Sequence, residues 1–164
     1  MRVAYHNDRT MICTLSLTAA LCFCCALALA ADPPAKRASG EFDVKLAQLP
    51  ADDKTVPPIL GRMSLDKQYH GDLEAAAKGE MLSAMTATEG SGVYVAIERV
   101  TGKLNGRNGS FLLHHTGTMA RGAQQLNIAV VPDSGTGELV GLAGKMTIVI
   151  EGKKHSYVFE YTLP

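Results

Sequence analysis

The feature that most constrains this chain is a two-residue alternation of apolar and polar side chains between glycine-bearing turns. Phe42, Val44 and Leu46 share one phase, as do Met63, Leu65, Tyr69 and Leu73, and later Tyr157, Phe159, Tyr161 and Leu163. Successive side chains of a β-strand point to opposite faces, so this period predicts strands with one buried face. Turn sequences such as HGD (70–72), EGSG (89–92), NGRNG (105–109) and EGKK (151–154) separate about eight such strands.

Helical pattern is scarce. The segment DLEAAAKGEML (72–82) has high helix propensity through its alanines, but Gly79 interrupts it and Met81, Ser83 and Met85 continue a strand phase. The segment TGELVGLAG (136–144) is expected to form one helical turn after a Thr136 cap. The predicted fold class is all-β with little helix, and eight antiparallel strands closed into a barrel solve the problem of exposed sheet edges better than a sandwich.

The first thirty residues have the form of a secretory signal. Arg2 and Arg9 precede the apolar run of residues 11–30, which ends in Ala28-Leu29-Ala30, so cleavage before Ala31 is expected. The run is also long enough for an uncleaved membrane anchor, an alternative that stays open. We therefore expect a periplasmic or secreted protein, with a disordered lead-in over residues 31–38 and a single domain over residues 39–164. The proline-rich stretch 49–59 is expected to be a loop.

The remaining chain carries no thiol, because all four cysteines lie between residues 13 and 25. A disulfide, a thiolate nucleophile and a cysteine-ligated metal are thereby excluded in the mature protein. Without Arg2, Arg9 and Asp8, the acidic residues outnumber the basic ones by one, and no basic run is present. This balance gives no reason to expect nucleic acid or, after signal cleavage, a membrane as a partner.

The segment from Val93 to Met119 predicts a hairpin that carries the best candidate site. A tight loop at Gly106-Arg107 sets Glu98 opposite His115, and an Asn105-Gly106 turn would shift the pairing while keeping both residues on one face. That face also carries Tyr94, Phe111 and Leu113, so we take it as the barrel interior. Glu98 and His115 would then lie about 5 Å apart across the strands.

A buried carboxylate beside an imidazole is suited to proton transfer, because burial and hydrogen bonding adjust its pKa. Glu98 and His115 are therefore the candidate catalytic residues. A purely structural network, or a solvated face, would place the same two residue types together. The adjacent His114 and His115 point to opposite faces of a strand, so they do not chelate one metal together, and no metal site is predicted.

Other polar or aromatic residues are candidates for binding a ligand. Lys67 shares the phase of Met63 and Leu65, so its ammonium either pairs with an interior acid or reaches the barrel mouth. Glu80 follows Gly79 in a semi-apolar strand, where it could join the cavity or sit on the outer rim. The predicted ligand-binding residues are Tyr69, Glu80, Tyr94, Phe111 and Tyr161.

Four separated segments carry a resemblance to a known family: GDLEAAAKGEMLSA, GVYVAIERVTGKLNGRNGSFLLHHTGTM, VVPDSGTGELVGLAGKMTI and KHSYVFEYTLP. In this order they resemble the bacterial domain of unknown function family 3224, whose members are similar in fold to the allene oxide cyclase barrel. The resemblance covers about residues 39–164 and implies an eight-stranded antiparallel barrel with a small central cavity. It does not imply cyclase activity. His114 stands where the family's usual LQH form has glutamine, which favours His115 as the important position, and the signal peptide is a departure from many members.

Three functions remain in competition. The first is an exported module that binds a small, mostly apolar molecule in the barrel, with no cofactor. The second is an isomerase, cyclase or hydrolase in which Glu98 acts as base and His115 orients or protonates. The third is a structural barrel packed solid by residues such as Met63, Met81 and Phe159, which forms oligomers through the outer residues Val93, Val95 and Ile97.

Overall fold

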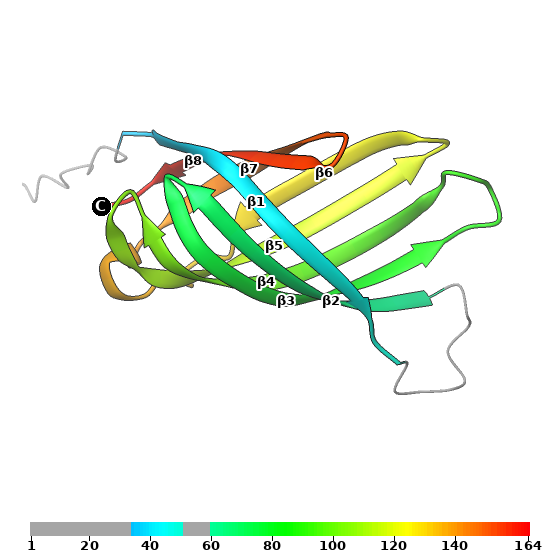
Figure 1. Ribbon diagram of the computed structural model, residues 1–164, viewed down its shortest axis with the longest axis horizontal. Helices are drawn as coiled ribbons and strands as arrows, with labels where there is room; N and C mark the ends of the chain where they lie inside the picture. The colour runs from blue at the N-terminus through cyan, green and yellow to red at the C-terminus, as the bar shows by residue number, and fades with distance from the viewer. Residues whose placement is uncertain (1–33, 51–59) are drawn as a thin grey trace, which may run out of the picture. The chain divides into compact units, whose positions relative to one another are not determined.

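The computed structural model describes residues 34–50 and 60–164. These residues form an eight-stranded antiparallel barrel, in which each strand pairs with its neighbours in the chain and β1 closes the sheet on β8 (Figure 1). The expected signal (1–30) and most of the expected loop (51–59) lie outside the described residues. The strands are β1 Lys36–Gln48, β2 Leu60–Gly71, β3 Leu73–Met85, β4 Gly92–Leu104, β5 Arg107–Ala120, β6 Ala123–Val130, β7 Ala143–Glu151 and β8 Lys154–Thr162.

Strand β1 begins earlier than the sequence suggested. Lys36 already pairs with Tyr161, and Ala38 is fully buried opposite Phe159 of β8. The expected disordered lead-in was therefore wrong for residues 36–38. Arg37 and Ser39 face outward, and Lys36 has the inward phase but is exposed as the first residue of the strand, so a charged stretch is compatible with a strand whose only buried residue here is a small alanine.

The alanine-rich segment is strand β3, not a helix, and its small residues have a role in packing. Ala75, Ala77 and Gly79 face the interior, and a Cβ at Gly79 would collide with the backbone of Ile97 on β4. The close approach of two strands thus overrides the helix propensity of alanine. The expected helical turn does form, as a 3-10 turn η1 over Gly137–Leu139. The side chain of Thr136 does not cap it, because its Oγ1 accepts the N–H of Ser110 at 3.0 Å.

The turn between β4 and β5 decides the register of the candidate site. Asn105 and Gly106 have φ values of 48° and 83°, which is the backbone of a type I′ two-residue turn. Ala96 therefore lies opposite His115, and Glu98 lies opposite Leu113. The pairing of Glu98 directly with His115 was wrong, since the loop is Asn105-Gly106. The two residues are diagonal neighbours on the same inward face.

The barrel is packed solid at one end and hollow at the other. The packed end holds the β2–β3 and β4–β5 turns, the 3-10 turn with its buried Leu139, and the stacked rings of Phe111, Phe159 and Tyr161. Toward the other end, which carries the β3–β4, β5–β6 and β7–β8 turns (Figure 1), inward-phase residues such as Leu126 and Ile150 are 45% and 61% exposed. In the described part of the chain, no helix is long and apolar enough to traverse a lipid bilayer.

The seam between β6 and β7 is the weakest junction of the barrel. Only Ile128↔Met146 and Ala129↔Lys145 pair across it, although the two strands span eight and nine residues. Every other junction has at least six pairs. The start of β6 and the end of β7 therefore part from each other toward the hollow end.

Candidate functional site

The polar centre of the barrel is the carboxylate of Glu98. Its side chain is fully buried, and Oε1 accepts hydrogen bonds from Lys67 Nζ at 3.0 Å and Tyr69 OH at 2.9 Å. The ring of His115 lies on the same oxygen, with Nε2 at 3.1 Å, so a carboxylate there makes Nε2 the protonated nitrogen. Three strands, β2, β4 and β5, supply this cluster. The structure thus brings the two candidate catalytic residues into contact and adds two partners from β2.

The sequence of β3 explains how β2 reaches β4. Lys67 pairs with Ala77, and Glu98 pairs with Gly79, so only small residues of the inward face separate the two side chains. A larger side chain on β3 would fill the space through which the Lys67–Glu98 ion pair forms. Of the two positions expected for the Lys67 ammonium, the structure shows the first: it pairs with the interior acid rather than reaching the barrel mouth, and Lys67 is only 5% exposed.

The electrostatics of the cluster keep Glu98 ionised. Burial acts to raise the pKa of Glu98, but the hydrogen bond from His115 and the charge of Lys67 outweigh it and hold the pKa below the ordinary value of 4.5. Burial, with the charge of Glu98 added, raises the pKa of Tyr69 well above its ordinary value. Tyr69 therefore stays protonated and donates to the carboxylate.

One oxygen of the cluster is left unused. Glu98 Oε2 is buried and has no hydrogen-bond partner among the described residues. A buried carboxylate oxygen without a donor is costly, so this atom has capacity for a water molecule or for a hydroxyl or amine of a bound molecule.

A cavity of about 320 Å³ lies next to the cluster, inside the hollow half of the barrel. Its walls are mostly apolar and include Phe42, Val44 and Leu65, while Lys67 and His115 form its polar side. Glu98 is not among the lining residues, whereas Lys67 and His115, which both contact its carboxylate, are. A second hollow of about 210 Å³ adjoins the first through shared lining residues, Met81 and Tyr94.

The cavity reaches the seam between β6 and β7. Leu126 of β6 and Ile148 and Ile150 of β7 line it, and these are inward-phase residues of the two strands that part from each other. Because Leu126 and Ile150 are also substantially exposed, the cavity communicates with solvent along this seam. Among the described residues, the cavity is therefore open to solvent where β6 and β7 part near the hollow end, and we call this gap the lateral opening.

The predicted ligand-binding aromatics divide by depth along the barrel. Tyr94 lines both hollows, and Tyr69 lies beneath the cavity, where its hydroxyl holds Glu98. Phe111 and Tyr161 were wrong as cavity residues. Both stack on Phe159 in the packed end, with ring centroids 5.8 and 5.2 Å away, and Tyr161 OH accepts from Asn105 Nδ2 at 2.9 Å. Alternation predicts which face of the sheet a residue lies on, but it does not predict how far along the barrel axis the residue lies.

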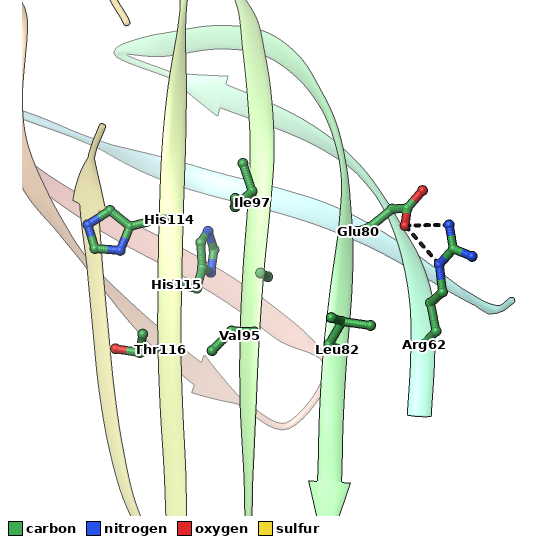
Figure 2. Close-up of a pocket in the computed structure, with 9 residues that line it drawn as sticks. Arg62, Glu80, Leu82, Val95, Ile97, His114, His115 and Thr116 are labelled. Atoms are coloured by element: carbon green, nitrogen blue, oxygen red, sulfur yellow. Dashed lines mark hydrogen bonds and ion pairs between the residues drawn. The ribbon is translucent and has the colours of Figure 1, made fainter. Parts of the chain in front are cut away.

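Of the two positions expected for Glu80, the structure shows the outer one: Glu80 lies on the outer face of β3 and does not line the cavity. Its carboxylate pairs with Arg62 of β2 at 2.9 Å (Figure 2). Successive side chains of a strand point to opposite faces, so Glu80 faces outward because Gly79 faces inward. Glu80 instead borders an outer groove of about 590 Å³. Other residues of this groove are labelled in Figure 2: Leu82, Val95, Ile97, His114 and Thr116.

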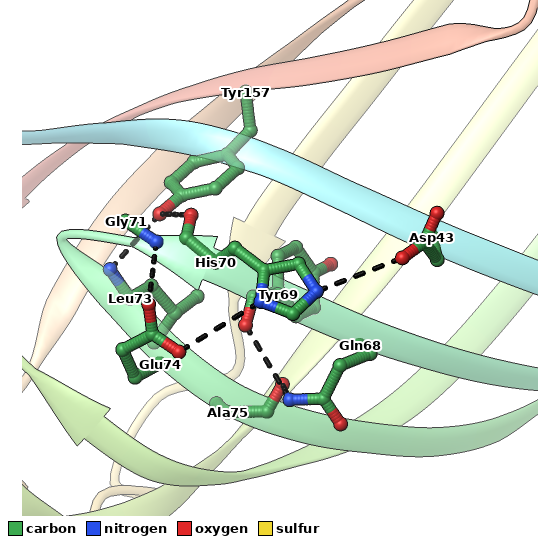
Figure 3. Close-up of polar contacts among 9 residues, drawn as sticks. All are labelled: Asp43, Gln68, Tyr69, His70, Gly71, Leu73, Glu74, Ala75 and Tyr157. Carbon is green, nitrogen blue, oxygen red and sulfur yellow. Dashed lines mark hydrogen bonds and ion pairs between the residues drawn. The ribbon is translucent and has the colours of Figure 1, made fainter.

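Two further residues, His155 and Tyr157, were not among the predicted site residues. His155 lines the cavity, and its ring packs against Phe42 with centroids 5.2 Å apart. Tyr157 closes the packed end: its hydroxyl donates to the carbonyl of His70 at 3.1 Å and accepts the N–H of Leu73 at 2.9 Å (Figure 3). Burial raises the pKa of Tyr157 to about 12. Both residues belong to the segment KHSYVFEYTLP, where they share the inward phase of Phe159. This alternation is the sequence signal that could have identified them as interior residues.

The histidines of the described residues do not gather into a metal site. His70 lies on the outer face, 3.6 Å from Asp43 and 3.9 Å from Glu74 (Figure 3), whereas His115 is inside the barrel. Within residues 34–50 and 60–164, no three histidine, cysteine, aspartate or glutamate side chains are grouped so that they could hold a metal ion.

Comparison with known proteins places the chain in a family. Residues 38–161 match the family model described as protein of unknown function (DUF3224). A solved structure of a DUF3224 protein of unknown function from Shewanella oneidensis MR-1 is 52% identical, covering 80% of this chain and 98% of that one, with a TM-score of 0.75. No curated protein matches the chain significantly. The chain belongs to the DUF3224 family, as its barrel and its four segments predicted.

Proposed function

We propose that the barrel binds one small, mostly apolar molecule that carries a hydrogen-bond-accepting end group. The observation that carries this proposal is the cavity of about 320 Å³, with apolar walls and the buried Lys67 and His115 on one side. Ligand sites in proteins have this composition, with a few placed polar groups that fix the orientation. At about 30 Å³ for one non-hydrogen atom, as for a liquid water, the cavity accommodates on the order of ten such atoms, and the cavity together with the adjoining hollow of about 210 Å³ accommodates on the order of eighteen.

The end group follows from the donors that face the cavity. An ammonium has three N–H donors, and Lys67 directs two of them at Tyr69 OH and Glu98 Oε1. The third donor of Lys67 remains for a bound molecule, whereas the second nitrogen of an imidazole protonated at Nε2 alone is an acceptor. Since Glu98 already balances the charge of Lys67, a neutral acceptor such as a carbonyl or hydroxyl oxygen suits this position better than a second carboxylate.

The cluster supports binding better than catalysis by Glu98. A general base works best with a pKa near the working pH, and the pKa of Glu98 lies below 4.5. Moreover, its carboxylate does not line the cavity, so a bound molecule meets Lys67 and His115 first. In this proposal Glu98 is a positioning residue that holds the two donors and Tyr69 in place.

A fluorescence titration with N-phenyl-1-naphthylamine tests the proposal. Ile148 faces the cavity and its neighbour Val149 faces outward, so Ile148→Trp fills the cavity and Val149→Trp is the matched control. We expect saturable binding to the unchanged protein and to Val149→Trp, and a loss of at least about tenfold in affinity for Ile148→Trp. Thermal melts check that both variants fold. Equal binding by the two variants would contradict a site in the barrel.

The location of this function is a separate proposal. Arg2 and Arg9, the apolar run and Ala28-Leu29-Ala30 support export with cleavage before Ala31. N-terminal sequencing of the protein from fractionated cells tests it. A mature chain that begins at Ala31 in the periplasm or medium is expected, and an uncleaved chain in the cytoplasm would contradict it.

A specific observation favours a second function, self-association through the outer face of the barrel. Leu82, Val95 and Ile97 are 56%, 47% and 58% exposed and border one groove on β3 and β4. An exposed apolar stripe of this kind is typical of a contact surface. Light scattering after gel filtration tests it: the protein should be larger than a monomer and Ile97→Glu a monomer, whereas a monomeric wild type would rule it out.

A further inference from the structure

We propose that Lys67 binds its ligand covalently and reversibly, as an imine with an aldehyde or an unhindered ketone. This inference rests on the proposed function, because it names the chemical class of the end group that enters the same cavity. Hydrogen bonding alone uses the N–H groups of Lys67 but not the nucleophilic character of its nitrogen.

Lys67 differs from the other lysines in its surroundings. It lies within the barrel and lines the cavity, whereas every other lysine in residues 34–50 and 60–164 is exposed. Its Nζ lies 5.2 Å from the ring centroid of Phe42 and 5.7 Å from that of Tyr69. A lysine in an apolar pocket is the group that proteins use to form imines with carbonyl compounds.

The neighbours of Lys67 supply what the reaction needs. Nζ attacks the carbonyl carbon, a C–N bond forms, and the carbonyl oxygen leaves as water. Overall, one ammonium and one aldehyde give one protonated imine and one water, with no oxidant or reductant. Nζ must release a proton before attack, and Glu98 Oε1, 3.0 Å away, is the nearest acceptor; because the pKa of Glu98 is low, it holds this proton only transiently and gives it back as water leaves. The proton taken up by Glu98 is the one that the leaving oxygen needs to depart as water, and His115 holds the same carboxylate oxygen in place at 3.1 Å.

The product fits the site as well as the reactant does. A protonated imine keeps the positive charge on Nζ, so the ion pair with the buried Glu98 carboxylate is preserved. The apolar walls next to Lys67 hold the alkyl or aromatic part of the carbonyl compound and limit access of water to the new bond. A purely structural lysine would need Glu98 but would not need to line a cavity.

Reductive trapping tests the inference on the unaltered protein. Octanal and sodium cyanoborohydride are added near neutral pH, and peptide mapping by mass spectrometry compares Lys67 with the exposed Lys78. We expect Lys67 to be alkylated at least about tenfold faster, because the cavity raises the local concentration of the aldehyde. Octan-1-ol, which has the same chain but no carbonyl, should suppress alkylation of Lys67 and leave Lys78 unchanged. Lys67→Arg keeps the positive charge but cannot form an imine, so the rapidly alkylated peptide should be lost while alkylation of Lys78 stays unchanged.

Displacement of N-phenyl-1-naphthylamine by octanal, followed without the reductant, separates the two proposals. If octanal displaces the dye but Lys67 is alkylated no faster than Lys78, the imine inference is overturned and the binding function stands. If the dye does not bind and octanal does not label Lys67 selectively, both the imine inference and the binding function fail. Displacement together with selective, octanol-sensitive alkylation supports both.

Discussion

Replacing Lys67 with methionine should destabilise the protein strongly at neutral pH. Methionine keeps most of the apolar stem in the barrel and removes the ammonium that lies 3.0 Å from Glu98 Oε1. Because Glu98 is fully buried, the variant leaves a carboxylate in the barrel without its cationic partner. The effect therefore measures the contribution of one ion pair to a barrel interior.

The magnitude follows from the geometry. Two unit charges separated by 3.0 Å attract each other by about 5 to 6 kcal/mol at an effective dielectric constant of about 20. Removal of one partner of a buried ion pair typically costs about 3 to 5 kcal/mol. Tyr69 and His115 still donate to Glu98 in the variant, so we expect a loss of about 3 kcal/mol in the free energy of unfolding.

The loss of stability in the variant should also depend on pH. In the unchanged protein the pKa of Glu98 is lowered by folding, so its contribution to stability is present above about pH 4.5 and is lost as the pH falls through the folded-state pKa. In the variant the lowering by Lys67 is lost, and we expect burial to outweigh the remaining hydrogen bond from His115 and to raise the pKa of Glu98 above its ordinary value. The variant should then gain stability as the pH falls from 7 toward 5, and the difference between the two proteins should narrow.

Urea unfolding followed by far-ultraviolet circular dichroism measures these free energies, and Lys78→Met is the control. Lys78 makes an exposed ion pair with Asp66 at 3.1 Å, so its replacement should change stability by no more than about 0.5 kcal/mol. A Lys67→Met variant within about 1 kcal/mol of the unchanged protein, or a deficit that is constant from pH 7 to 5, would refute the reasoning.

Three further changes probe the site. His115→Ala removes one donor of the buried cluster and should cost about 1 to 3 kcal/mol in urea unfolding; a loss below about 0.5 kcal/mol would mean that the cluster is wet. Gly117→Ala places a Cβ against the ring of Tyr94, so about 1 to 3 kcal/mol of stability and part of the dye affinity should be lost; unchanged dye binding would contradict that role of Tyr94. A disulfide between Gln125→Cys and Val149→Cys, which extends the pairing of β6 with β7, should slow dye association in stopped-flow until it is reduced, and an unchanged rate would exclude the lateral opening.

The barrel was predictable because its pattern is local. Alternation identified the strands, and the inward face that carries Tyr94, Glu98 and His115 is as predicted. The register was harder, since both turns at NGRNG keep that face and only the φ values of Asn105 and Gly106 distinguish them. A shift of two residues preserves the side of the sheet, so a hydrophobic pattern does not detect it.

The composition of the site was less predictable, because it depends on strands that are not neighbours. Lys67 reaches Glu98 across β3 only because Ala77 and Gly79 are small, and those residues look like a helix former and a breaker in the sequence. Phe111 and Tyr161 share a face with the cavity residues but lie in the packed end, where η1 closes the barrel. Depth along the barrel depends on how all eight strands are staggered.

The central claim is that Glu98 is an ionised carboxylate held inside the barrel by Lys67, Tyr69 and His115. A pH titration of its side-chain carboxyl carbon by ¹³C nuclear magnetic resonance tests this most directly, with the resonance assigned by its absence in Glu98→Gln. The structure predicts a midpoint below 4.5 and an ionised group throughout the neutral range. A midpoint above 4.5 would show that burial outweighs the three donors and would contradict the account of the site.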